Sequence, residues 1–315
     1  MSGVRLAALF PGQGSQKVGM AHELYAASPA AKRVLDEAER ALPGLLKLMW
    51  EGPAEDLQLT ANQQPALVAA GAAAYAAWLE AGGLAAEFGA GHSLGEYTAH
   101  VAAGSLSVAD AVQLVRRRGT YMQEAVPEGQ GAMAAVMKLE QTQIDEALAR
   151  VSADAPALVV EVANLNSPGQ TVISGNTGGV AAASAALKDL GGRVIPLKVS
   201  APFHCSLMQP AADQLATDLT ATAFAVPAFS IVCNVTAEPL PGPAAAPGLL
   251  TQQVTGSVRW VECVERLQAL GATHYVEFGS GSVLTGLVGR ILDGAFARAV
   301  DAPGTLATVI EEVRS

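Results

Sequence analysis

The segment GAGHSLGEYTAH, residues 89–100, contains a serine between two glycines in the pattern Gly91-x-Ser93-x-Gly95. Residues 87–90 predict a short strand and residues 94–103 a helix, so Ser93 lies in a sharp turn that exposes its hydroxyl, as a nucleophile requires. Glycines let strand and helix approach closely, and the first N–H groups of the helix face developing negative charge. The spacing alone fits an ordinary Ser-Gly turn equally well, so the strand-to-helix context carries the catalytic interpretation.

The composition excludes several classes of protein. The chain has 315 residues, 50% of them hydrophobic, and a formal net charge of −10, which disfavours a nucleic-acid partner. Three cysteines far apart in sequence, Cys205, Cys233 and Cys263, argue against a disulfide framework or a metal site. The start of the chain lacks the pattern of a signal peptide, and the Ala-rich stretch 66–79 is too short for a membrane span. We expect a cytoplasmic protein without a membrane partner.

Strand and helix patterns divide the chain into two parts. An apolar run at residues 4–10 predicts a buried strand that ends in a tight loop at Pro11, and helical patterns follow as far as residue 83. Ser107 and Asp110 form a candidate capping box for a helix that ends near Glu124. Further strands are expected at residues 229–235 and 273–278, and residues 239–248 are expected to form a surface loop.

Residues 127–198 form the second part and have a different pattern of strands and helices. It predicts strand, helix, strand, strand, helix and strand at residues 132–139, 142–151, 157–165, 170–174, 180–190 and 193–199. This order is that of a ferredoxin-like βαββαβ unit. The predicted fold class is therefore α/β, with a ferredoxin-like subdomain at residues 127–198 inserted into a larger domain made of residues 1–126 and 199–315.

A nucleophilic serine needs a base, and five histidines compete for that role. The side chain of His92 is expected to diverge from Ser93 across the turn, and His100 lies roughly 10 Å away by helix rise alone. The residues leave three histidines open: His22, His204 and His274.

Arg118 is an arginine on an apolar helix face. At about 100° per residue it lies with Leu114 and Met122, whereas Arg117 lies with the polar residues and Arg116 points away. An inward arginine requires acceptors, because an unpaired buried charge is costly. An internal Asp or Glu and the carboxylate of a substrate are equally good candidates at this point.

At this stage the sequence resembles a known family, the malonyl-CoA:acyl carrier protein transacylases and the related polyketide synthase acyltransferase domains. The resemblance spans nearly the whole chain and rests on ordered motifs: FPGQGSQ at residues 10–16, QPAL at 64–67, GHSLGEY at 91–97, RG at 118–119, MQEAVP at 122–127, NSPGQ at 166–170 and FH at 203–204.

The resemblance implies a role for each matching residue. Ser93 is the acyl-accepting nucleophile, His204 its general base, and Arg118 the ligand of the malonyl carboxylate. The backbone N–H groups of Gln13 and Leu94 form the oxyanion hole. In this family a main-chain carbonyl orients the histidine, and the matching residue is Gln253. The implied fold is an α/β-hydrolase-like core with the inserted subdomain, and the site is expected in the cleft between them.

The implied reaction is a ping-pong transfer in which Ser93 takes a malonyl group from malonyl-CoA and passes it to the phosphopantetheine thiol of acyl carrier protein, for fatty acid biosynthesis. No metal or bound cofactor is implied. The pair Phe203-His204 resembles that of malonyl-selective acyltransferases, although core packing explains Phe203 equally well. A stand-alone polyketide acyltransferase, a serine thioesterase or esterase, and a binding module with an inactive site are the alternatives.

Carrier proteins are typically acidic, and this chain is acidic overall. Recognition of the carrier is therefore expected to rest on a local basic patch. The candidate residues for this patch are Lys17, Arg116, Arg117 and Lys198.

Overall fold

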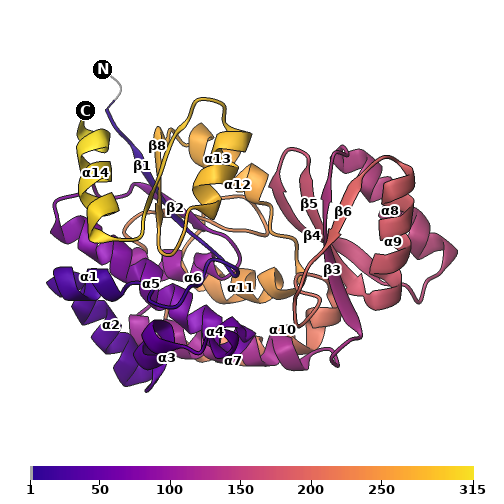
Figure 1. Cartoon of the computed structure of the whole chain (residues 1–315), viewed down its shortest axis with the longest axis horizontal. Helices are drawn as coiled ribbons and strands as arrows, with labels where there is room; N and C mark the ends of the chain where they lie inside the picture. Colours follow the sequence, from indigo (N-terminus) through magenta and orange to yellow (C-terminus); the bar gives the residue numbers. More distant parts are fainter. Residues whose placement is uncertain (1–2) are drawn as a thin grey trace.

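The computed structural model describes residues 3–315, which form two β-sheets surrounded by helices (Figure 1). The larger sheet lies on the side of the molecule that holds both chain ends. All of its strands are parallel, in the order β7 (Ser230–Val232), β2 (Phe88–Gly91), β1 (Leu6–Phe10), β8 (His274–Phe278) and β9 (Phe296–Val300).

The central strand β1 is apolar throughout because helices cover both faces of the parallel sheet. Leu6, Ala8 and Phe10 contribute to one hydrophobic core. Ala7 and Leu9 contribute to the core on the opposite face. All five side chains are fully buried, which explains the continuous apolar run in the sequence.

Most helices pack on the first face. The first core takes residues from α1 (His22–Ala27), α2 (Pro29–Ala41), α3 (Leu45–Glu51), α4 (Ala54–Gln58), α5 (Thr60–Glu80), α6 (Gly95–Ala102), α7 (Val108–Glu124), α10 (Gln209–Ala221), α11 (Ala246–Thr255) and α14 (Pro303–Arg314). The second core takes residues from α12 (Trp260–Ala269) and α13 (Val283–Ile291). Helix α5 is buried over most of its surface, as predicted for residues 66–79. Within residues 3–315, no helix has the length and apolar character needed to cross a membrane.

The smaller sheet is antiparallel. Its strand order is β4 (Val160–Ser167), β5 (Gln170–Asn176), β3 (Gly131–Met137) and β6 (Arg193–Pro196). Helices α8 (Gln141–Asp154) and α9 (Thr177–Asp189) pack on one face of it. Along the chain, the strands and helices follow the order that the sequence pattern predicted.

Several sequence-based expectations were wrong in their boundaries. The strand predicted at residues 229–235 covers only Ser230–Val232. The strand predicted at residues 193–199 ends at Pro196, although the N–H of Leu197 still donates to the carbonyl oxygen of Met133 at 2.9 Å. The loop predicted at residues 239–248 gives way to a 3₁₀ turn at Pro243–Ala245, and helix α11 begins at Ala246. Pro247 lies in the first turn of that helix, where the missing N–H is no loss.

The other face of the antiparallel sheet packs against the larger part of the molecule. Met133, Ala135 and Val172 belong to the first hydrophobic core. The backbone of Val258 also pairs with β4, because its N–H donates to Ala163 O at 2.9 Å and its carbonyl accepts from Leu165 N at 2.9 Å. The two sheets are therefore joined by apolar packing and by main-chain hydrogen bonds.

Strand β2 and helix α6 approach each other too closely for side chains at their glycines. A Cβ on Gly91 would lie 1.8 Å from the carbonyl carbon of Gly95. A Cβ on Gly95 would lie 2.0 Å from the carbonyl oxygen of Phe10. These contacts are with backbone, so only glycine allows β1, β2 and α6 to pack in this way.

We predict that Gly95→Ala lowers the free energy of unfolding by at least about 3 kcal/mol, because backbone atoms must move to admit the methyl group. The matched control is Gly286→Ala in the exposed part of helix α13, where a Cβ would meet nothing within 4 Å. That change is expected to leave stability unchanged or raise it by about 0.5–1 kcal/mol. Urea denaturation followed by circular dichroism measures both, and equal effects would contradict the packing argument.

Candidate active site

Ser93 occupies the sharp turn between β2 and α6. Its φ of 52° lies in the left-handed region, which is uncommon for a residue with a side chain. Its backbone N–H donates to Asn234 Oδ1 at 2.7 Å, so a buried amide holds the strained turn. The serine is 6% exposed and lines a cavity.

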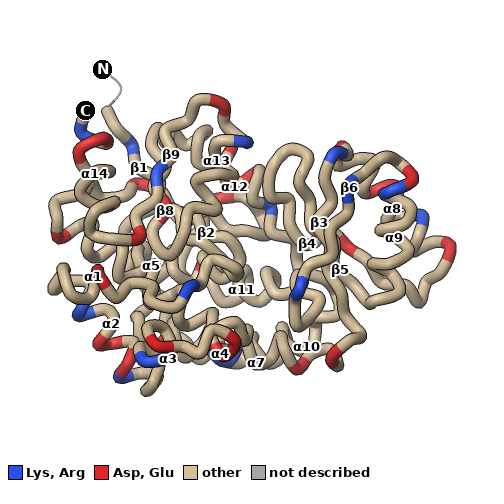
Figure 2. The backbone as a smooth tube through the Cα atoms, in the orientation of Figure 1, with Lys and Arg blue, Asp and Glu red and all other residues tan. Residues whose placement is uncertain are grey.

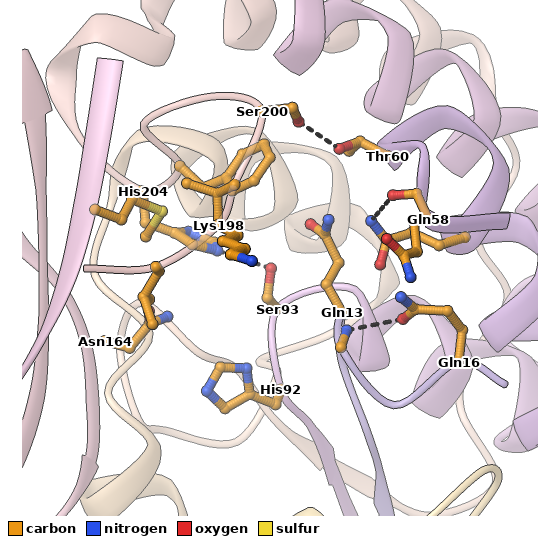
Figure 3. A pocket seen from close by; sticks show the side chains of 16 residues that line it. Gln13, Gln16, Gln58, Thr60, His92, Ser93, Asn164, Lys198, Ser200 and His204 are labelled. Atoms are coloured by element: carbon orange, nitrogen blue, oxygen red, sulfur yellow. Dashed lines mark hydrogen bonds between the residues drawn. The ribbon is translucent and has the colours of Figure 1, made fainter. Parts of the chain in front are cut away.

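That cavity has a volume of about 740 Å³ and lies between the two sheets (Figure 3). The larger part of the molecule contributes Gln13, Gly14, Gln16, Gln58, Thr60, Gln63, His92 and Ser93 to its lining. The antiparallel sheet and the segment after it contribute Met133, Asn164, Leu197, Lys198, Val199, Ser200, Phe203 and His204. Its size is that of a pocket for a small molecule or a flexible substrate arm.

His204 is the histidine that the fold brings to Ser93. Its Nε2 lies 2.7 Å from Ser93 Oγ. Its Nδ1 lies 2.9 Å from the carbonyl oxygen of Gln253 and 3.1 Å from that of Gly256. Carbonyl oxygens only accept, so Nδ1 carries the proton and Nε2 is free to accept from the serine hydroxyl.

The other histidines are occupied elsewhere. His22 packs against Trp50 with a ring-centroid distance of 4.8 Å, and the ring of His274 packs against Phe296 at 4.4 Å. The ring of His92 turns away from Ser93, and its Nε2 lies 2.8 Å from Asn166 Oδ1 (Figure 3). His100 is fully buried, with Nδ1 3.2 Å from Ser105 Oγ.

The environment of His204 keeps its ring neutral. Burial, and secondarily the positive charge of Arg118, lower the pKa of His204 to about 3. The imidazole is therefore in its basic form at any pH well above 3, as a general base must be.

Arg118 is fully buried beneath the serine, as its position on the apolar face of α7 predicted. Its Nη2 donates to Ser93 Oγ at 3.1 Å and to Gln253 Oε1 at 3.0 Å, and its Nη1 donates to Gln64 Oε1 at 2.9 Å. No Asp or Glu of residues 3–315 forms a salt bridge with it. Its Nε has no hydrogen-bond partner within those residues. Of the two acceptors left open by the sequence, an internal acid is not the one observed.

Gln13 and Leu94 lie in the two segments that follow β1 and β2. Phe10 in β1 is aligned with Gly91 in β2, so the segments after these residues emerge side by side. Across residues 3–315, neither N–H donates to another protein group, whereas the N–H of Ser93 is taken by Asn234. Neither group is therefore taken up by the fold itself.

Phe203 precedes the base and lines the cavity at 7% exposure. It also belongs to the first hydrophobic core. The structure therefore places this side chain where it contacts both the core and the cavity.

Sequence reasoning missed three amides that organise the site. Gln64 lies in the motif at residues 64–67, which indicates no role for it. For Gln253 the resemblance implies a role for the backbone carbonyl and none for the side chain. Asn234 is fully buried and comes soon after the strand Ser230–Val232. In the sequence, a polar residue directly after an apolar run is the only signal that could have identified it. All three hold the backbone or guanidinium around Ser93.

The four residues expected to form a basic patch differ in their surroundings. Lys17 pairs with Asp301, Nε of Arg117 lies 3.1 Å from Asp218, and Arg116 bonds to Asn62. Figure 2 shows both signs of charge spread over the outer helices and loops. Only Lys198 of the four lines the cavity. Acids therefore pair with two of the four candidates.

Within residues 3–315, no group of three His, Cys, Asp or Glu side chains is arranged to hold a metal ion. The cysteines are three buried free thiols.

Comparison with known proteins adds a family to this geometry. Residues 8–292 match the acyl transferase domain family. The chain is 45% identical over 309 residues to the malonyl CoA-acyl carrier protein transacylase of Escherichia coli, covering 98% of this chain and 99% of that protein. It is 44% identical to the protein of the same name from Bacillus subtilis, covering 98% of each.

Solved structures agree along the whole chain. The acyl-carrier-protein S-malonyltransferase of Burkholderia pseudomallei has a TM-score of 0.93 at 43% identity, and the match covers 98% of this chain and 100% of that one. A type II polyketide synthase malonyl-transacylase, solved in complex with its acyl carrier protein, has a TM-score of 0.93 at 42% identity, covering 98% of this chain and 99% of that one.

We predict that a serine-directed fluorophosphonate labels Ser93 at the same rate at pH 6.5 and at pH 5. A histidine with an ordinary pKa of about 6.5 would lose about 15-fold in this interval through protonation, whereas His204 stays neutral. Intact-mass spectrometry measures the rate, with His204→Ala as the control for background reactivity. A loss of 10-fold or so would show that His204 titrates normally.

Proposed function

This chain belongs to the acyl transferase domain family, and we propose that it transfers the malonyl group from malonyl-CoA to the phosphopantetheine thiol of an acyl carrier protein. The observation that carries this proposal is the position of Ser93 Oγ, which lies 2.7 Å from a neutral histidine base and 3.1 Å from a buried arginine. The first group activates the hydroxyl, and the second is suited to a carboxylate on the acyl group.

In the first half-reaction, Ser93 Oγ attacks the thioester carbonyl while its proton passes to His204 Nε2. The N–H groups of Gln13 and Leu94 stabilise the oxyanion. The tetrahedral intermediate collapses, the carbon–sulfur bond breaks, and the proton on Nε2 passes to the departing thiolate of coenzyme A. Throughout, the Nδ1–H group of His204 donates to the carbonyl oxygen of Gln253, which stabilises the imidazolium in the intermediate.

In the second half-reaction the thiol of the carrier protein repeats these steps in the opposite direction. His204 removes the thiol proton, the thiolate attacks the malonyl-serine ester, and Ser93 Oγ recovers its proton from Nε2. A thioester and a serine ester are of similar energy, so the exchange is reversible. No metal or bound cofactor takes part in these steps.

Arg118 holds the malonyl carboxylate in this proposal. Its protein partners in residues 3–315 are neutral oxygens, so its charge is not cancelled by a salt bridge. A planar guanidinium can bind a carboxylate with two parallel hydrogen bonds, which also fixes the direction of the acyl group relative to Ser93. Phe203 and Met133 supply apolar walls to the cavity that Ser93 lines.

Lys198 is the residue through which we expect an anionic carrier to be guided toward the cavity. It is exposed, lies on the segment after β6, and lines the pocket (Figure 3). The pathway served is fatty acid biosynthesis in the cytoplasm. A polyketide pathway would use the same chemistry, and one similar structure is a polyketide synthase transacylase bound to its carrier.

The fold supports a finer description. We assign the parallel sheet and its β2-turn-α6 unit to an α/β-hydrolase-like core, made of residues 1–126 and 199–315. The antiparallel sheet, with order β4-β5-β3-β6 and two helices on one face, supports a ferredoxin-like subdomain at residues 127–198. The division places Ser93 and His204 in the core and the outer wall of the cavity in the subdomain.

Incubation with malonyl-CoA is expected to add one malonyl group to the chain, and Ser93→Ala is expected to abolish the adduct. Intact-mass spectrometry detects it, and addition of a phosphopantetheinylated acyl carrier protein should remove it with formation of malonyl-carrier. Release of free malonate at a rate similar to carrier acylation would favour a thioesterase or esterase. Absence of any adduct would favour a binding module with an inactive site.

We predict that Arg118→Ala lowers kcat/KM for malonyl-CoA by about two decades, of order 3 kcal/mol, because the acyl carboxylate then has no partner in a buried site. Acetyl-CoA carries no such charge, so its slow reaction should change little. Arg118→Lys is expected to recover part of the loss, since an ammonium group cannot form both parallel hydrogen bonds.

The control for this experiment is Arg117→Ala on the same helix, because Arg117 lies beside Asp218 away from the cavity lining. It should leave the ratio of malonyl to acetyl transfer unchanged. A proportional loss of both activities in Arg118→Ala, with folding verified by circular dichroism, would make Arg118 a structural residue.

A further inference from the structure

Glu96 is a buried acid that the reaction described above does not use. It lies in the first turn of α6 and is 1% exposed. Its Oε2 accepts from Gln253 Nε2 at 2.7 Å and from the backbone N–H of Asn234 at 3.0 Å. No Lys, Arg or His of residues 3–315 forms a salt bridge with it.

Glu96 and Arg118 contact opposite ends of one amide. Gln253 donates from Nε2 to Glu96 and accepts at Oε1 from Arg118 Nη2 at 3.0 Å. The carboxylate thereby determines which end of the amide faces the arginine. If Gln253 turned over, its NH₂ group would face the guanidinium, and two donors would meet.

The same residue connects this pair to the reacting groups. The backbone carbonyl of Gln253 accepts from His204 Nδ1, and its Nε2 also donates to the carbonyl of Ser93 at 3.0 Å. A change in the charge of Glu96 therefore alters the hydrogen bonds of Gln253, the residue that contacts the nucleophile, the base and the arginine.

Binding of an acyl carboxylate at Arg118 changes the net charge of the buried site. With Glu96 ionised, Arg118 and Glu96 together are neutral, and a second carboxylate leaves one uncompensated negative charge in a buried site. Such a charge is costly, and two carboxylates near one cation favour protonation of one of them. The acyl carboxylate contacts Arg118 directly, so Glu96 is the group that takes the proton.

The neighbouring titratable groups do not compete for this role. The groups whose charges act on Glu96, or on which its charge acts, are Arg118 on α7, Tyr97 on α6, Cys233 after β7 and Cys263 on α12. Burial raises the pKa of the tyrosine and of both thiols, so they remain neutral. His204, with a pKa lowered to about 3, is also neutral.

We propose that Glu96 is a positioning residue that binds one proton from solvent when a carboxylated acyl group occupies Arg118, which couples acyl selection to proton uptake. This rests on the proposed function of Arg118. In the free enzyme, burial outweighs the hydrogen bonds and the charge of Arg118 and raises the pKa of Glu96 to about 7. Binding of the acyl carboxylate cancels the effect of Arg118 and raises this pKa further.

The sign of the pH effect follows from this order of pKa values. Below about pH 7 Glu96 is protonated in both states, so the acylation equilibrium does not depend on its titration. Above that pH, forming the malonyl-enzyme requires uptake of a proton, and the equilibrium constant falls by up to about tenfold per pH unit. It becomes constant again above the pKa of Glu96 in the malonyl-enzyme.

The test measures the equilibrium between free and acylated Ser93 by intact-mass spectrometry from pH 6 to pH 9, with malonyl-CoA and with acetyl-CoA. Ionisation of the coenzyme A thiol affects both equilibria equally, so the ratio of the two constants isolates the acyl carboxylate. In the wild type this ratio is expected to fall about tenfold between pH 7 and pH 8.5. In Glu96→Gln it should be independent of pH.

The outcomes separate this proposal from the function. If Ser93 is not malonylated, the proposed function fails. If it is malonylated and the wild-type ratio is constant with pH, proton uptake is excluded while the transferase stands. The wild-type comparison decides the matter even if Glu96→Gln does not fold. If that variant folds and keeps the pH dependence, another group takes the proton.

Discussion

Backbone-to-backbone packing at Gly91, Gly95 and Phe10 is the constraint on which the active site depends. Strands β1 and β2 are parallel neighbours with Phe10 aligned to Gly91, so their following loops emerge at the same edge of the sheet. One loop carries Gln13, and the other carries Ser93. The start of α6 then presses against the end of β1, which is possible only because no Cβ intervenes. The nucleophile and both free N–H groups are consequences of this one contact.

Neutral groups hold the charged and reactive groups of the site. Arg118 is surrounded by the oxygens of Gln64, Gln253 and Ser93, and His204 is oriented by main-chain carbonyls. A carboxylate beside the imidazole would raise its pKa and would also compete for the arginine. Amides and carbonyls fix both side chains without supplying a negative charge. The guanidinium therefore keeps its electrostatic attraction for an anionic acyl group.

Glu96 is the exception in this neutral setting. It contacts the amide of Gln253 rather than Arg118 itself, so it balances the buried cation without occupying the position of a ligand. The antiparallel sheet contributes Met133 and Asn164 to the wall of the cavity. The hydrogen bonds between Val258 and β4 keep that sheet against the core.

The local features of this protein follow from residues close together in the chain. The turn at Ser93, the buried strand β1, the inward face of Arg118 and the order of strands and helices in residues 127–198 were all predictable, because periodicity and turn residues act over a few positions. The resemblance to a family then assigned His204 and Gln253. The residues alone left three histidines equivalent, because His204 lies 111 positions from Ser93.

Long-range packing decided the rest. Asn234 and Gln253 reach the serine turn from positions 141 and 160 residues away, and no spacing rule relates them to it. Arg118 forms no salt bridge within residues 3–315 whereas Lys17 and Arg117 do, and this difference depends on which acids the fold brings near. Local propensity sets strands and turns, whereas the partner of a buried polar group is set by how the two sheets and their helices pack together.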